Sequence, residues 1–144
     1  MFSKACEYAI KSVIFVAQEA LAGRKTNVKQ ISEATNAPES FVAKILQPLS
    51  KKGILISNKG KQGGFTIDID KLEKIKLIEI VLITDGADIL TRCAFGLDKC
   101  SSEKPCPFHF KYKPIRESLQ RSLSEISIYD MALKTEQGEA FLKI

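Results

Sequence analysis

Three cysteines and one histidine lie close together in the second half of this 144-residue chain. The pattern is Cys93-x6-Cys100-x5-Cys106, and the only histidine, His109, stands three residues after the third cysteine. Thiolates and imidazole favour iron-sulfur, zinc or copper(I) over magnesium or calcium. The residues between them lack a helix or strand period, which predicts a loop that can wrap these donors around one small centre.

The spacing of these donors separates the candidate metals. Structural zinc sites usually contain close C-x2-4-C pairs, and both cysteine gaps here are wider. A bridged iron-sulfur cluster tolerates wider gaps, and histidine can replace cysteine at an iron. We therefore favour an iron-sulfur cluster, with zinc and a metal-free regulatory disulfide as alternatives. Buried structural cysteines are the least favoured interpretation, because Lys, Asp, Ser and Glu surround them.

Length and composition limit the class of protein. With 44% hydrophobic and 27% charged residues, the chain is typical of one compact globular unit with an appendage. No apolar stretch reaches the roughly 18 residues of a membrane span, and residues 1–4 lack the layout of a signal peptide. These features predict a cytoplasmic protein without a membrane partner, in which cysteines stay reduced.

Positive charge is concentrated in the first half. Residues 1–76 hold 13 Lys and Arg against 7 Asp and Glu, whereas residues 77–144 hold 9 against 10. This asymmetry favours a polyanionic partner for the first half, although a lysine surplus also serves solubility. Five lysines and no acidic residue lie between Lys44 and Lys61, which fits phosphate contacts with double-stranded DNA.

The periodicity of the first half predicts three helices. Apolar residues repeat on one face over residues 3–21, and Cys6 lies on that face, so we interpret this cysteine as a core residue. Asn27 followed by Gln30 is typical of a capping box that begins a short second helix, and Pro38 suits the first turn of a third. Two short helices joined by a tight turn predict a helix-turn-helix, whose second helix reads the major groove.

A β-hairpin is predicted directly behind these helices. Residues 54–58 and 65–68 have the pattern of two short strands around a basic, glycine-rich tip. In this position the hairpin would be the wing of a winged helix, with a tip small enough to approach the phosphate backbone or minor groove. The candidate DNA-binding residues in these elements are Asn27, Val28, Glu39, Ser40, Phe41, Lys44, Lys51, Lys59, Gly60, Lys61, Gln62 and Gly63.

The second half predicts a sensor loop over residues 91–110 followed by a long helix. Ile115, Leu119 and Leu123 repeat there at helical spacing. An amphipathic helix beyond a complete winged domain predicts a homodimer, although it could also pack on its own domain. The predicted fold is therefore mainly α with a small β-hairpin, divided into a winged helix-turn-helix domain over 1–76 and a cluster-binding and dimerisation region over 77–144.

Together these features resemble a known family, the IscR/NsrR-type winged-helix regulators, many of which bind a [2Fe-2S] or [4Fe-4S] cluster. The likeness runs almost end to end. Its markers are Tyr8-Ala9, Ile31-Ser32, Ser40-Phe41, Leu49-Ser50-Lys51-Lys52-Gly53-Ile54-Leu55, Lys59-Gly60-Lys61-Gln62-Gly63-Gly64-Phe65 and Thr91-Arg92-Cys93. The resemblance implies a homodimeric transcription regulator, either repressor or activator, with Cys93, Cys100 and Cys106 as ligands of a cluster for which we favour [2Fe-2S].

The resemblance implies two candidates for a fourth ligand. IscR-like members use a histidine where His109 stands, whereas NsrR-like members borrow an acidic residue from the partner subunit's first helix, which here is Glu7. We favour His109, because a local ligand does not depend on dimer geometry. Two departures limit what the resemblance implies for this chain. Ala43 cannot hydrogen-bond a base, so the operator sequence of relatives with a polar residue there does not carry over. The gap between Cys93 and Cys100 is longer than in some members, which leaves a [4Fe-4S] cluster open.

The mechanistic hypothesis is that oxidation, nitrosylation or loss of the cluster reshapes residues 91–110 and changes the spacing of two DNA-reading heads. A same-fold regulator that senses through a partner protein, without metal, is one rival. The other is an enzyme with His109 and a cysteine as base and nucleophile. No second histidine, nucleophile elbow or phosphate-binding loop supports the enzyme, so we predict a regulator instead.

Overall fold

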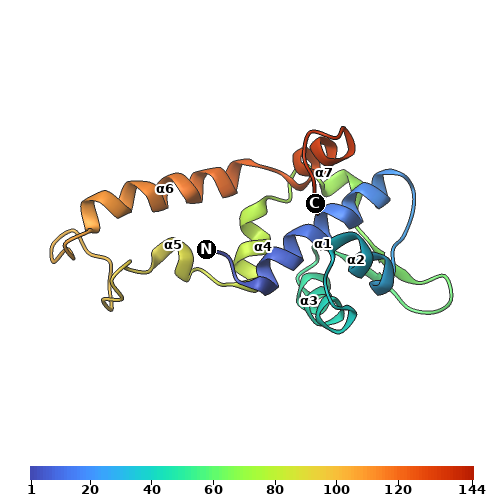
Figure 1. The fold of residues 1–144 in the computed structure, drawn as a ribbon, viewed down its shortest axis with the longest axis horizontal. Helices are drawn as coiled ribbons and strands as arrows, with labels where there is room; N and C mark the ends of the chain where they lie inside the picture. Colours follow the sequence, from blue (N-terminus) through green and yellow to red (C-terminus); the bar gives the residue numbers. More distant parts are fainter.

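The structure is a computed structural model that describes all 144 residues. Figure 1 shows an elongated molecule in which a helical body carries a long arm, formed by residues 88–125. In chain order the elements are α1 (Lys4–Leu21), α2 (Val28–Thr35), α3 (Glu39–Lys51), β1 (Ile56–Asn58), β2 (Gly64–Thr66), η1 (Ile69–Lys71), α4 (Leu77–Thr84), α5 (Asp88–Thr91), α6 (His109–Glu125) and α7 (Ile128–Glu136). This order confirms the predicted mainly α fold with one small antiparallel hairpin.

Local polar signals set the ends of the first helices. Ser3 Oγ accepts the Cys6 N–H at 3.0 Å where α1 begins. Asn27 and Gln30 form the predicted capping box, in which each side-chain oxygen accepts the other residue's N–H at 2.9 Å. Asn36 ends α2 in the left-handed conformation, with φ of 54°, which asparagine adopts more readily than most residues. The helix-turn-helix is thus encoded by short-range sequence.

The hairpin is shorter than the sequence predicts. Each strand has three residues, with Ile56 opposite Thr66 in the antiparallel register. Ile54 and Leu55, expected in the first strand, are buried, and their N–H groups both bond the Leu49 carbonyl, at 3.0 and 3.3 Å. These two residues close the end of α3 against the core, so the strand begins only after them.

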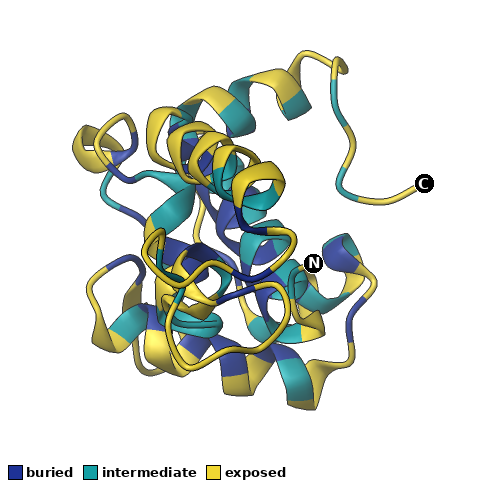
Figure 2. Ribbon diagram, turned by 90° about the vertical axis from the view of Figure 1, so that its left-hand side faces the viewer, coloured by how far each residue is buried: buried dark blue, intermediate teal, exposed yellow.

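The core surrounds α1 and extends into the last helix. The main buried cluster joins α1, α2 and α3 with Ile80 of α4 and with Ile128 and Ala132 of α7. Buried segments, dark blue in Figure 2, gather on the inward sides of the helices. Helix α7, which the sequence analysis did not predict, packs against α1. The hydrophobic core therefore extends across the predicted domain boundary at residue 76.

A second, smaller cluster attaches the arm to α1. It consists of Cys6, Val81, Leu90 and Leu123, which come from α1, α4, α5 and α6. Cys6 is fully buried, as predicted, and this burial raises the pKa of its thiol. Helix α1, which packs against α2 and α3, therefore also supports the arm.

The arm places the two predicted functional regions far apart. In Figure 1, α6 runs away from the body, the cysteine-bearing loop lies at its far end, and the hairpin lies at the opposite end of the molecule. None of the helices has both the length and the apolar character that crossing a membrane requires. Helix α4 contacts α6 on one side and both α1 and α3 on the other, so it connects the two regions.

Candidate DNA interface and metal centre

The outer face of α3 carries most of the predicted base-reading side chains. Glu39, Ser40 and Lys44 are exposed. Phe41 is half-buried and packs edge-to-face against Tyr8 of α1, with ring centroids 5.5 Å apart. Phe41 thus anchors the reading helix to α1, and the exposed face of α3 is polar and basic.

The start of α2 is joined directly to the hairpin. Thr26 and Phe65 form an isolated antiparallel bridge, with N–H···O distances of 3.0 and 2.6 Å. Asn27 is exposed, with its side-chain oxygen engaged in the helix cap, while Val28 is half-buried against the core. The hairpin is therefore held in a fixed position relative to the helix-turn-helix.

The hairpin tip is a tight turn that two of its glycines require. Gly60 has a φ of 99°, a conformation that side chains disfavour, and its carbonyl accepts the Gly63 N–H at 2.9 Å. A Cβ atom on Gly63 would lie 2.8 Å from that same carbonyl oxygen, so alanine does not fit without a backbone shift. The predicted contact residues that are exposed here and at the end of α3 are Lys51, Lys59, Gly60, Lys61 and Gln62.

Cys93 lies directly after α5 and is surrounded by backbone donors. Hydrogen bonds from the Leu97 and Phe95 N–H groups, with a smaller contribution from the Cys106 thiol, hold the pKa of Cys93 below its ordinary value. Both cysteines are buried, with 5% and 7% of their surface exposed. The site therefore stabilises a thiolate, the form that binds metal and attacks disulfides.

Cys100 is paired with His109 instead. Its Sγ lies 3.3 Å from His109 Nδ1, and Ser102 Oγ lies 3.1 Å from Nε2 on the other side of the ring. His109 is only 3% exposed and is the first residue of α6, with its N–H bonded to the Cys106 carbonyl at 3.0 Å. His109 thus joins the middle of the loop, around Cys100 and Ser102, to the start of α6.

Among the predicted ligands, Cys100 lies beside His109, and the Cys106 thiol contributes to the lowered pKa of Cys93. No three Cys, His, Asp or Glu side chains lie close enough together to hold one metal ion. A [2Fe-2S] cluster has two irons that each take two protein ligands, and histidine can replace cysteine in such a set. Three thiols and one imidazole are therefore donors that such a cluster accepts.

Glu7, the other candidate ligand, lies outside this loop. Its carboxylate pairs with Lys4 Nζ at 2.8 Å on α1, and this ion pair holds the pKa of the Glu7 carboxyl below its usual value. The structure does not bring Glu7 together with Cys93, Cys100 or Cys106 of its own chain.

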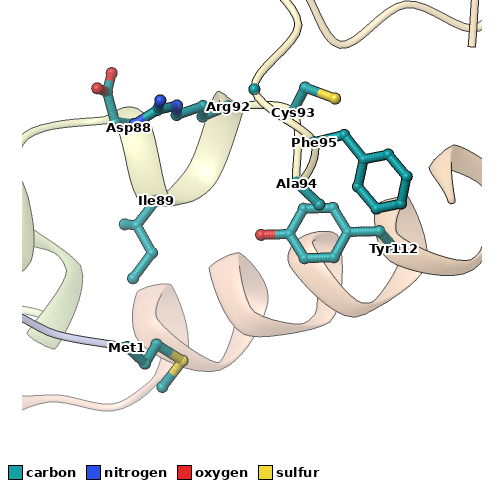
Figure 3. Close-up of a pocket in the computed structure, with 9 residues that line it drawn as sticks. Met1, Asp88, Ile89, Arg92, Cys93, Ala94, Phe95 and Tyr112 are labelled. Atoms are coloured by element: carbon teal, nitrogen blue, oxygen red, sulfur yellow. The ribbon is translucent and has the colours of Figure 1, made fainter. Parts of the chain in front are cut away.

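Two grooves flank Cys93. One of about 530 Å³ runs between α5 and α6, where Figure 3 shows Arg92 and Cys93 on one side and the rings of Phe95 and Tyr112 beside each other. The other, of about 600 Å³, extends from Arg92 to Cys100. Small solutes can therefore approach Cys93 and Cys100 from outside.

Two residues near the loop were missed by sequence reasoning. Ser102 had no recognisable signal, because a serine in a polar loop rarely has a defined partner. Arg116 has no signal in the sequence beyond its place among the polar residues of a helix, yet its Nη1 donates to the Arg92 carbonyl at 3.0 Å. Both act through contacts between segments that the sequence does not reveal.

Known proteins share the sequence pattern and the fold of this chain. A family model named Rrf2 and described as an iron-dependent transcriptional regulator matches residues 2–134. The chain belongs to the Rrf2 family. This membership confirms the predicted kind of protein, a DNA-binding transcription regulator and not an enzyme.

Individual relatives agree with membership of the Rrf2 family. An Aquifex aeolicus protein, named only as a candidate HTH-type transcriptional regulator, is 28% identical over 133 residues, which cover 91% of this chain and 90% of that protein. The HTH-type transcriptional regulator IscR of Photorhabdus laumondii is 26% identical over 129 residues, covering 90% and 77%. The structure of CymR, the global cysteine regulator of B. subtilis, has the same fold, with a TM-score of 0.75, 20% identity and coverage of 94% and 98%.

Proposed function

We propose that this Rrf2 protein is a cytoplasmic, homodimeric regulator whose DNA affinity is set by an iron-sulfur cluster held by Cys93, Cys100, Cys106 and His109. The gathering of three cysteines and His109 in one loop, with Cys100 Sγ 3.3 Å from His109 Nδ1, carries the proposal, because it would supply the cysteine and histidine donors that some [2Fe-2S] clusters take. We accordingly favour [2Fe-2S] over [4Fe-4S]. The name of the related IscR protein and the iron-dependent description of the family point the same way.

The chain's own residues have distinct parts in this proposal. When bound, the cluster supplies redox chemistry and reactivity toward nitric oxide, which makes it a sensor of redox, nitric oxide or iron-sulfur status. The N–H groups of Phe95 and Leu97 favour the thiolate of Cys93. The aromatic residues Phe95, Phe108 and Tyr112 stack in series, with successive centroids 6.0 Å apart, and pack the loop against α6.

Residues 1–76 would form the DNA-reading head. Glu39, Ser40 and Lys44 on the exposed side of α3 would enter the major groove, while Lys59 and Lys61 would contact phosphates. The remaining candidates would contact the backbone or support these residues; they are Asn27, Val28, Phe41, Lys51, Gly60, Gln62 and Gly63. Because lysine contacts release counterions, binding would weaken steeply with salt.

Residues 77–144 would form the cluster-binding and dimerisation region. Helix α6 leaves Phe110 and Ile115 exposed, at 67% and 61%, on an arm that projects from the body. A second α6 that covered these side chains would pair the two subunits and set their reading heads roughly 34 Å apart. In that dimer Glu7 of the partner subunit would be the alternative fourth ligand.

The proposal is tested by measuring operator affinity for the cluster-loaded and the cluster-free protein under anaerobic conditions. Genomic selection with the loaded protein first supplies the operator. We expect the two forms to differ by about 5- to 150-fold, the usual range of coupling between two sites. Equal affinities would show that the loop does not control DNA binding.

A second candidate function rests on the Cys93 thiol. Its lowered pKa and its position beside Cys106 also suit a metal-free sensor in which an oxidant converts the two thiols to a disulfide. The fold shared with CymR, named a cysteine regulator, is compatible with such thiol chemistry. Iron and sulfide analysis separates the two functions, because only the cluster sensor contains both elements.

A further inference from the structure

The ring of His109 faces a different partner at each nitrogen. Nδ1 points to the sulfur of Cys100 at 3.3 Å, whereas Nε2 points to the hydroxyl of Ser102 at 3.1 Å. The ring is buried and also packs edge-to-face with Phe110, at a centroid distance of 5.0 Å. These contacts fix the orientation of the His109 ring.

Ser102 is held where it can serve this ring. The hydroxyl oxygen of the preceding Ser101 accepts the N–H groups of Glu103 and Lys104, at 3.1 and 3.4 Å, and so closes a turn around Ser102. A serine hydroxyl can accept a hydrogen bond from an imidazole N–H. The turn thus fixes an acceptor on the side of the ring that faces away from Cys100.

Metal ligation uses one imidazole nitrogen and leaves a proton on the other. Histidine ligands commonly donate that second N–H to a fixed acceptor, which sets the tautomer and makes the ligating nitrogen a stronger donor. In His109 the acceptor lies at Nε2, and the sulfur ligand lies at Nδ1. The geometry therefore divides the ring into a ligand side and a support side.

We propose that Ser102 is a positioning residue: its Oγ accepts the Nε2–H of His109, so that His109 presents Nδ1 to iron beside Cys100. This inference rests on the proposed function. It adds which atom binds and which residue controls it.

The single histidine in the chain allows a direct test. Full-length protein is made with histidine labelled with ¹⁵N at Nδ1 only, or at Nε2 only, and loaded anaerobically with its cluster. Pulsed electron paramagnetic resonance of the reduced cluster then measures each coupling. A directly bound nitrogen couples several-fold more strongly than the remote one, so we expect the strong coupling from the Nδ1 label.

Variants of Ser102 test the positioning role. Ser102→Ala removes the acceptor and should raise the reduction potential of the cluster, because a less basic imidazole donates less charge to iron. Ser102→Thr keeps the hydroxyl and should restore the wild-type potential. Ser124→Ala removes an exposed hydroxyl elsewhere on α6 and should leave the potential unchanged.

The possible outcomes distinguish failure of the role of Ser102 from failure of the proposed iron-sulfur function. A strong coupling from the Nε2 label, or an unchanged potential in a fully loaded Ser102→Ala protein, would overturn the role of Ser102. A cluster with no strong nitrogen coupling from either label would also overturn it, while leaving an iron-sulfur function with another fourth ligand. Wild-type protein that cannot be loaded at all would overturn both.

Discussion

Arg116 of α6 donates a hydrogen bond from Nη1 to the backbone carbonyl of Arg92, the residue before Cys93, at 3.0 Å. The same atom lies 3.4 Å from the Thr91 carbonyl, and the guanidinium lies over the Tyr112 ring, 5.8 Å from its centroid. One side chain therefore joins the end of α5, the start of the cysteine loop and the arm helix.

Removal of this side chain should weaken communication between the loop and the DNA-reading head. For Arg116→Ala we expect the ratio of DNA affinities between loaded and cluster-free protein to shrink by about 2- to 30-fold, which corresponds to a coupling change of about 0.5–2 kcal/mol. Arg121→Ala, on an exposed position of the same helix, is the matched control. An unchanged ratio in Arg116→Ala, with the cluster still present, would show that Arg116 does not transmit the state of the loop.

Asn27 combines a structural role with a proposed contact to DNA, and two substitutions separate these roles. Asn27→Ala loses the helix cap and should lower the free energy of unfolding by about 1 kcal/mol. Asn27→Asp keeps a capping oxygen, so its unfolding free energy should stay near the wild-type value, but its negative charge would repel phosphate and weaken DNA binding. Denaturant unfolding and DNA titration measure the two effects. If Asn27→Asp bound DNA with wild-type affinity, Asn27 would not lie near the phosphate backbone.

The lysines of the hairpin tip should contribute charge without sequence preference. Lys59→Ala and Lys61→Ala are each expected to weaken binding to all DNA sequences alike and to reduce the slope of log affinity against log salt by about 0.9. Lys134→Ala is the control, because α7 lies on the other side of α1 from α3 in Figure 1. A slope that responds equally to all three substitutions would argue against a wing that contacts phosphate.

The cysteines should differ in their reaction with an alkylating reagent. Backbone hydrogen bonds lower the pKa of Cys93, whereas burial raises that of Cys6. Only the thiolate reacts, so in cluster-free folded protein Cys93 should become reactive at lower pH than an ordinary thiol, and Cys6 only at higher pH. Peptide mass spectrometry after alkylation across a pH series measures both, with urea-unfolded protein as the reference in which the difference disappears. Faster labelling of Cys6 than of Cys93 in the folded protein would contradict these environments.

The reading head was largely predictable because its signals are local. The capping box of Asn27 and Gln30 and the glycines around Gly60 act over a few residues, and each formed as predicted. The first strand was predicted too long, because Ile54 and Leu55 have the composition of a strand but are held by the Leu49 carbonyl and the core. A run of apolar residues does not distinguish a strand from the buried end of a helix.

The packing of the last helices and the contacts of the loop cysteines could be predicted less well from the sequence. Helix α7 had a local signal in Ser127 and Asp130, which form a capping box, but its packing on α1 joins residues more than a hundred positions apart. Spacing indicated one centre, but it did not reveal that Cys100 Sγ lies 3.3 Å from His109 Nδ1. Such contacts depend on how the loop folds against the start of α6.

The most direct test of the account is iron, sulfide and absorption analysis of protein purified without oxygen. We predict visible absorption with equal amounts of iron and sulfide, at two of each per chain for [2Fe-2S], as each iron takes two protein ligands. Both should be lost in Cys93→Ala and retained in Cys6→Ala, because Cys6 is a core residue. Absence of iron and sulfide after anaerobic reconstitution, or their full retention in Cys93→Ala, would contradict the proposed cluster.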